Sequence, residues 1–129
     1  MSISVSSRKA KGRKLQQWTA QKISELTGIP WGKDELIASR EGAQAGTDIR
    51  LIGKALKLFP FSVENKFCES WAVHQWIEQA KANQLDGTDW IVIAKRSREK
   101  PVVIMDAETF FRLCKEREAN ATKNNQETI

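Results

Sequence analysis

The feature that most constrains the fold is a strand–helix–strand order in the middle of the chain. Segment 60–67 (PFSVENKF) places apolar residues at alternating positions, which is typical of a strand with one buried face. Segment 69–84 carries Trp76 and Ala80 on one apolar stripe, which predicts a helix, and segment 90–95 (WIVIAK) is typical of a buried strand. Two strands joined in this way lie parallel in one sheet, with helices covering it. The order therefore predicts an α/β fold with helices on both sides of the sheet.

The rest of the chain supplies further helices and strands around this unit. They are predicted from periodic apolar residues and, for the last helix, from the capping residue Asp106. The expected elements are a helix from about residue 8 or 12 to 27, a short helical turn over 34–37, strands at 48–52 and 102–105, and a last helix from 106 to about 116. The fold class is thus α/β, with a mixed sheet of about four strands flanked by helices.

Chain length and terminal composition predict one domain with loose ends. The 129 residues suffice for one sizeable core and are too few for two. Residues 1–7 are rich in serine, and residues 118–129 are polar. We therefore expect a flexible N-terminus and a disordered tail around a folded domain at 8–117.

Several absences indicate a cytoplasmic protein with no membrane partner. No apolar run approaches the roughly 20 residues that cross a bilayer, and the first residues lack the apolar centre of a signal peptide. The two cysteines, Cys68 and Cys114, have no metal-like spacing and are expected to be reduced, half-buried thiols. We expect neither zinc nor a small-molecule cofactor.

Positive charge is concentrated in two segments. The chain has 21 Lys and Arg residues against 16 Asp and Glu, for a formal net charge of +5. Clustered cations favour a polyanionic partner, most simply DNA, whose backbone they would hold without reading its sequence. The alternative is that they only keep a small protein soluble. The residues expected to contact DNA are Arg8, Lys9, Lys11, Arg13 and Lys14, then Arg40, and in the 95–100 loop Lys95, Arg96 and Arg98.

Three charged residues are placed unusually for strands that enter a core. Asp48 begins one strand, while Glu64 and Lys66 lie two residues apart in the next and so share a face. The 15 residues between Asp48 and Glu64 let the two strands lie side by side. Two converging carboxylates call for a cation, and oxygen ligands favour Mg²⁺, with Mn²⁺ as a substitute. Lys66 could then position or deprotonate a water. The alternative is an exposed charge pair on an edge strand, which is common and worth little.

Three further side chains have two readings each. Gln79 lies on the helix after this strand, either orienting a water or a phosphate at the site or merely solvated. Trp31 and Trp71 are poorly explained by the apolar stripes of the helices. Each packs in the core or at a dimer interface, or else stacks on an unpaired base.

The segments GTDIRLI and FPFSVENK resemble the PD-(D/E)xK nuclease superfamily, in which D and then (D/E)-x-K follow on adjacent strands. The match falls on Asp48, Glu64, Asn65 and Lys66, and the wider similarity, over about residues 11–114, is to small bacteriophage-type nucleases that resemble Holliday junction resolvases. The resemblance implies a restriction-endonuclease-like core and a metal held by Asp48, Glu64 and the Asn65 carbonyl. It also implies that Lys66 activates water with help from Gln79. A homodimer, branched DNA as substrate and the cytoplasm of a bacterial host follow from the same resemblance.

The chain departs from the superfamily pattern on its first helix. Many members carry a glutamate there that completes the metal site, whereas this helix offers Gln16 and Gln17. Glu25 and Glu41 are alternative sources of the missing carboxylate, and the number of metal ions stays open. The same departure supports a rival hypothesis, in which the chain is a non-catalytic DNA-binding module with an impaired metal site.

Overall fold

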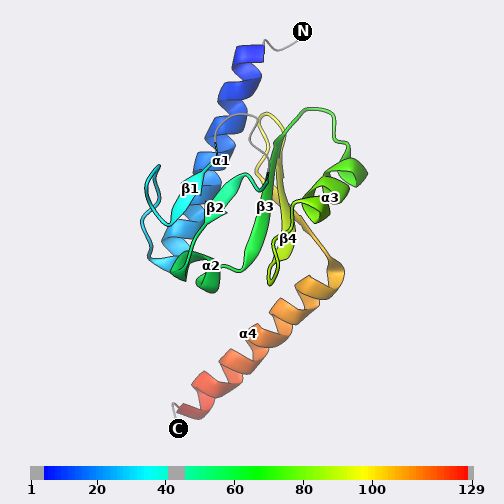
Figure 1. The fold of residues 1–129 in the computed structure, drawn as a ribbon. Coiled ribbons are helices and arrows are strands. Elements are labelled where there is room, and N and C mark those ends of the chain that lie inside the picture. The colour runs from blue at the N-terminus through cyan, green and yellow to red at the C-terminus, as the bar shows by residue number, and fades with distance from the viewer. Residues whose placement is uncertain (1–4, 41–45, 128–129) are drawn as a thin grey trace.

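A computed structural model describes residues 5–40 and 46–127, and within them the chain alternates between helices and strands. Most of these elements are short, so the longest ones, the first and last helices, dominate the outline of the molecule (Figure 1). In chain order they are α1 (Val5–Thr27), β1 (Ile37–Ser39), β2 (Ile49–Leu51), α2 (Lys54–Leu58), β3 (Phe61–Phe67), α3 (Val73–Ala82), β4 (Asp89–Lys95), β5 (Val102–Met105) and α4 (Ala107–Glu127).

The strand–helix–strand unit forms as predicted. Strands β3 and β4 pair in parallel, from Phe61 opposite Asp89 to Phe67 opposite Lys95, with α3 as the connection between them. Strand β5 returns along β4 in antiparallel fashion and completes a three-stranded sheet in the order β3-β4-β5. The expected basic loop at 96–101 joins β4 to β5 as a hairpin connection.

Both faces of this sheet are covered at β3 and β4, as the crossover predicted, whereas Val102 and Val103 of β5 are exposed. Val63, Ile91 and Ile93 face a core shared with α1, β1 and β2. Val92 and Ala94, from the alternate positions of β4, face a second core under α3. Figure 1 shows α1 and α3 on opposite sides of the sheet. The chain is therefore mixed α/β, with β3 buried between two layers.

The expected single sheet of about four strands is wrong in its details. Strand β2 pairs with β1 in a separate antiparallel sheet, from Ile37 opposite Leu51 to Ser39 opposite Ile49. The sequence led us to expect a helical turn over 34–37, but Ile37 is fully buried in the α1 core and draws this segment alongside β2. The linker after β2, expected to be irregular, forms the short helix α2.

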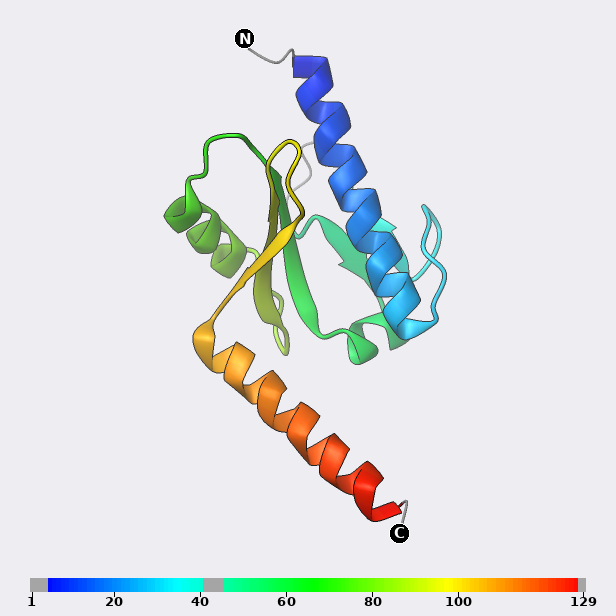
Figure 2. The same cartoon turned by 180° about the vertical axis from the view of Figure 1, so that it is seen from behind.

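Both chain ends carry more helix than the sequence suggested. Residues 5–7, expected to be flexible, belong to the first turn of α1. Helix α4 continues past Glu116 to Glu127, through a polar segment for which we expected disorder. Figures 1 and 2 show α4 pointing away from the two sheets. Residues 1–4 and 128–129 lie outside the described part of the chain.

Two findings bear on the predicted location. In the described segments, no helix is both long and apolar enough to cross a membrane. Both cysteines are free thiols, and Cys68 is half-buried as expected, whereas Cys114 lies exposed on α4.

Candidate active site

Asp48 lies immediately before β2 and holds β3 at two points. Its N–H donates to the carbonyl oxygen of Val63 at 2.9 Å, and its Oδ2 accepts a hydrogen bond from the Asn65 N–H at 2.7 Å. These two bonds flank Glu64 along the strand. The predicted convergence of Asp48 with the E-x-K strand is therefore present, and it occurs where the two sheets meet.

Glu64 and Lys66 share the face of β3 that α3 covers. Glu64 is only 2% exposed, and its Oε1 accepts a hydrogen bond from Asn83 Nδ2 at 2.8 Å. Lys66 Nζ donates to Gln79 Oε1 at 2.6 Å. Gln79 and Asn83 are one helical turn apart, so α3 presents a pair of amides to the two charges. Gln79 is thus placed at the site, as predicted.

Asn65 points its side chain to the opposite face, as strand alternation requires. Its Nδ2 donates to Thr19 Oγ1 on α1 at 2.8 Å, and its Oδ1 is buried without a hydrogen-bond partner in the described chain. The backbone groups of Asn65 point in a different direction from its side chain. The N–H and C=O of one strand residue leave on the same side, so the Asn65 carbonyl is directed toward Asp48 along with the N–H that binds it. This agrees with a carbonyl role for Asn65.

Burial makes ionisation of both carboxyl groups costly. The pKa of Glu64 is raised to about 7, mainly by burial and also by the neighbouring Asp48 charge, against the lowering effects of Asn83 and Lys66. Burial also raises the pKa of Asp48, opposed by the Asn65 N–H and by the positive charges of Lys66 and Arg40. Two carboxylates that are short of water and close together form a site that a cation would stabilise.

The residues present fit a hard divalent cation. Mg²⁺ is commonly bound through one or two carboxylates, with waters and substrate phosphates filling its other positions. Asp48, Glu64 and the Asn65 carbonyl match that ligand set. Within residues 5–40 and 46–127, no group of three or more His, Cys, Asp and Glu side chains is gathered to hold a metal.

The candidates for a further carboxylate or amide ligand are scattered. Glu25 pairs with Gln21 and Lys22 on the C-terminal half of α1. Gln17 lines a groove that also contains Arg40. Gln16 is half-buried on α1. Glu41 lies outside the described residues.

The raised pKa of Glu64 predicts that the stability of the metal-free protein depends on pH. The folded state holds this proton more tightly than the unfolded chain, whose carboxyl has the ordinary value of 4.5. Its contribution to stability is therefore complete below pH 4.5 and lost as pH rises through about 7, a change of up to about 3 kcal/mol. Thermal unfolding of metal-free protein from pH 5 to 8 measures it, with Glu64→Gln as the control that lacks the step. Equal pH dependence in both proteins would contradict the buried, protonated Glu64.

The two basic segments meet in space, close to the end of β3. Lys11 Nζ donates to Ser97 Oγ at 3.1 Å, which joins α1 to the loop between β4 and β5 (Figure 2). Lys11 and Lys95 both place their ammonium groups over the Phe67 ring, at 5.5 and 5.2 Å from its centroid. Because successive strand residues point to opposite faces, Phe67 lies on the α1 face of β3, and this basic surface lies near the end of β3 on the face opposite Glu64 and Lys66.

The individual cations differ in the hydrogen bonds that they make and in their exposure. Lys95 donates to the carbonyls of Arg96 and Glu99 and so shapes its own loop. The N–H of Arg40 donates to the Asp48 carbonyl at 2.8 Å, which places Arg40 next to the carboxylates. The remaining expected DNA contacts are exposed side chains, namely Arg8, Lys9, Arg13, Lys14, Arg96 and Arg98.

Sequence reasoning missed one residue of this site, Asn83. The available signal was its spacing of four from Gln79 at the end of the helix, which puts both amides on one face. The assembled site takes Asp48 from the start of β2, two charged residues from β3 and two amides from α3. Comparison of the chain with models of protein families, with curated proteins and with solved structures finds no match.

Proposed function

We propose that this protein is a metal-dependent endodeoxyribonuclease of the PD-(D/E)xK type, on a restriction-endonuclease-like core. One observation carries the proposal: Asp48 is hydrogen-bonded to the backbone of β3 beside Glu64, with Lys66 on the same face two residues along. If E-x-K occurred in this strand by chance, a second carboxylate from outside its sheet would not be expected beside it. The raised pKa values of both carboxyls support the same conclusion.

The roles of the residues follow from their positions. Asp48, Glu64 and the Asn65 carbonyl would hold Mg²⁺, for which Mn²⁺ would substitute. Bound there, the ion would offset the charge of a scissile phosphate and acidify a water. Lys66 supplies the cation that orients or deprotonates the attacking water. Gln79 acts through Lys66, since its Oε1 holds the lysine ammonium group. Glu64 is kept from bulk water by α3, which strengthens these electrostatic interactions.

DNA is the proposed partner because α1 and the 96–101 loop form a basic surface at the end of β3, the strand that carries Glu64 and Lys66. Contacts from exposed Lys and Arg to phosphates would make binding steeply dependent on salt and insensitive to sequence. A branched substrate, such as a Holliday junction, and a bacteriophage context rest on the resemblance of the motif segments.

The decisive experiment offers the protein a panel of DNA substrates. Linear duplex, single-stranded and four-way junction DNA are incubated with Mg²⁺ or Mn²⁺, and the products are separated on denaturing gels. Internal cleavage that EDTA prevents is the expected result. Tight junction binding without cleavage with either ion would instead favour the non-catalytic module. That rival has one observation behind it, the lack of a third carboxylate near Asp48 and Glu64 among the described residues.

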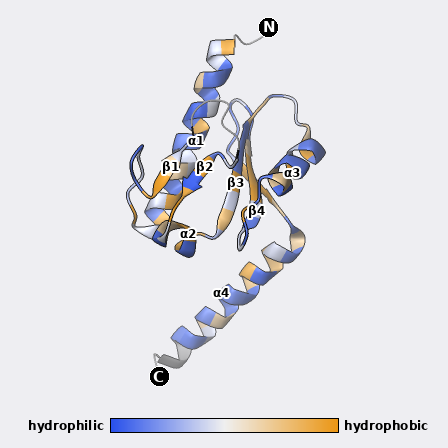
Figure 3. Cartoon of the chain, in the orientation of Figure 1, coloured by the Kyte–Doolittle hydropathy of each residue, from blue (hydrophilic) through white to orange (hydrophobic). Residues whose placement is uncertain are grey.

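A homodimer is proposed from exposed apolar surface. Phe110 and Phe111, near the start of α4, are 51% and 68% exposed, and Figure 3 shows an apolar stretch in this half of the helix. A separate apolar groove, whose lining includes Trp18, Leu26 and Val103, runs between α1 and β5. Asp106 caps α4 by accepting a hydrogen bond from the Glu108 N–H. Since both the phenylalanines and the groove are exposed and apolar, we infer that the phenylalanines of one copy bind the groove of a second copy.

We expect Phe111→Asp to convert the dimer to a monomer, because a charge cannot be buried there without a partner. Light scattering after size-exclusion chromatography measures the mass of each protein. Lys115→Ala, on the same helix, is the control that keeps the dimer. A monomeric wild-type protein at about 100 μM would overturn the proposal, since a specific dimer of ordinary affinity would form at that concentration.

A further inference from the structure

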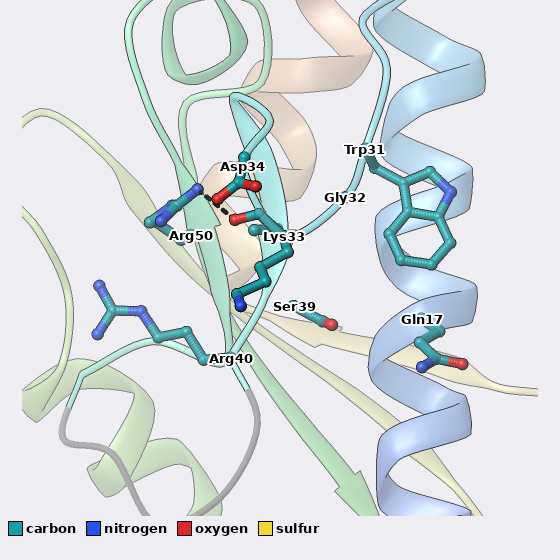
Figure 4. Close-up of a pocket in the computed structure, with 9 residues that line it drawn as sticks. Gln17, Trp31, Gly32, Lys33, Asp34, Ser39, Arg40 and Arg50 are labelled. Atoms are coloured by element: carbon teal, nitrogen blue, oxygen red, sulfur yellow. Dashed lines mark hydrogen bonds between the residues drawn. The ribbon is translucent and has the colours of Figure 1, made fainter.

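An open groove of about 660 Å³ lies on the outer side of β1 and β2, next to the candidate site. Figure 4 shows its two walls: Trp31 and Gln17 lie on the α1 side, and Lys33, Arg40 and Arg50 lie on the other. Asp34 is the acidic residue of the lining. The groove thus combines an aromatic ring with three cations and one carboxylate.

The groove continues the face that carries Asp48. In the antiparallel pair, Ala38 lies opposite Arg50, and the Arg40 N–H bonds to the Asp48 carbonyl one step along. Residues two apart on a strand share a face, so Asp48 and Arg50 point the same way, as do Ala38 and Arg40. The small side chain of Ala38 leaves room beside Arg50. Because Arg40 lines the groove and bonds to Asp48, a polymer bound at Asp48 can extend past Arg40 into the groove.

The groove is held in shape before any ligand arrives. Arg50 Nη2 donates to the carbonyls of Glu35 at 2.8 Å and of Lys33 at 3.3 Å, which fixes the guanidinium group. The buried Arg50 Nε has no hydrogen-bond partner in the described chain. Trp31 Nε1 donates to Gln21 Oε1 at 2.5 Å, which orients the half-buried indole ring. Pre-set side chains lose little conformational freedom on binding.

We propose that this groove binds an unpaired strand of the DNA substrate, which continues from the phosphate at Asp48. A cationic groove with an aromatic wall is the pattern of single-strand binding, because phosphates follow the cations while a base stacks on the ring. The base pairs of a duplex are stacked on one another and offer Trp31 no free face. The inference rests on the proposed nuclease function and specifies its substrate class: DNA with a single-stranded segment, such as an overhang, flap or open junction.

The test measures binding separately from cleavage. Fluorescence anisotropy in metal-free buffer gives the affinities of Trp31→Leu, Lys33→Ala and wild type for a single-stranded oligonucleotide, an overhang duplex and a blunt duplex. Stacking of one base is worth about 1–3 kcal/mol, so Trp31→Leu is expected to weaken binding of both unpaired substrates about tenfold. Lys33→Ala is expected to lower the salt slope by about 0.7, the value for one phosphate of a single strand. The blunt duplex should bind all three proteins equally.

Two controls keep the result interpretable. Lys115→Ala, on distant α4, removes the same charge as Lys33→Ala and should change nothing. Trp31 also packs against the α1 core, so the folding of its variant is checked by thermal unfolding. If the Trp31 variant is unfolded, the exposed Lys33 variant alone tests binding in the groove.

The outcomes separate the two proposals. Equal loss of affinity for blunt and overhang DNA, or no loss in either variant, would overturn the groove while leaving cleavage by wild type as support for the nuclease. Selective loss for unpaired DNA in a protein that cleaves no substrate would leave the groove standing and overturn the nuclease.

Discussion

Glu64→Gln is expected to abolish DNA cleavage and at the same time to stabilise the metal-free protein. The amide keeps the shape of the side chain and can still accept the hydrogen bond from Asn83 Nδ2. It removes a buried negative charge that faces Asp48, so at pH 8 the free energy of unfolding should rise by up to about 3 kcal/mol. Losing a carboxylate ligand of the metal should cost about a thousandfold or more in cleavage rate.

Two measurements on the same samples check this. Thermal unfolding in EDTA at pH 8 reports stability, and single-turnover cleavage with Mg²⁺ reports activity. Glu78→Gln, an exposed change on α3, is the matched control and should alter neither quantity. A Glu64→Gln protein that cleaves at the wild-type rate would remove Glu64 from the active site. A less stable one would show that its carboxylate has a favourable partner in the folded state.

Lys66→Ala is expected to lower the cleavage rate by about 10²–10⁴-fold, the usual contribution of a positioned acid–base group. Its effect on stability should be small, because Lys66 is half-buried and its ammonium group bonds to the exposed side chain of Gln79. Metal binding should be no weaker, since the variant removes a positive charge next to Asp48 and Glu64. The separation of rate from affinity distinguishes a lysine that acts in the reaction from one that only balances charge.

Single-turnover rates and calorimetric titration with Mn²⁺ measure the two quantities. Lys81→Ala, in the last turn of α3, is the control for loss of a nearby lysine. Gln79→Ala should give a smaller loss of rate than Lys66→Ala, because it frees the ammonium group without removing it. If Lys66→Ala cleaves as fast as wild type, the assignment of Lys66 is wrong.

The parts of the fold that could be predicted are those with a local periodic signal. The alternation in β3 fixed which face carries Glu64 and Lys66, and the apolar run of β4 with the stripe of α3 led to the parallel crossover. The position of Asp48 beside them followed from chain order. The site was therefore predictable where each residue's direction is set by its own strand.

The remaining features depend on contacts that no local pattern encodes. Strand β1 has three residues and exists because Ile37 is buried against α1 and pairs with β2. Asn83 joins the site because α3 runs back along β3 in a register that its sequence does not specify. Helix α4 exceeds its predicted length: apolar periodicity ends near Glu116, and the polar segment that follows, with three asparagines, gives no local signal for the helix that it forms.

The two hydrogen bonds between Asp48 and β3 bear on which substitutions the chain could accept during evolution. If the proposed nuclease activity were lost, Lys66 would be free to change, because its ammonium group bonds to an exposed glutamine. Asp48 would be under a further constraint, because losing its carboxylate would leave the Asn65 N–H without its bond, while the bond from the Asp48 N–H to Val63 would remain. Retention of this aspartate among descendants is then weak evidence of catalysis. Substitution of Lys66 would be the first sign in the sequence that the proposed activity had been lost.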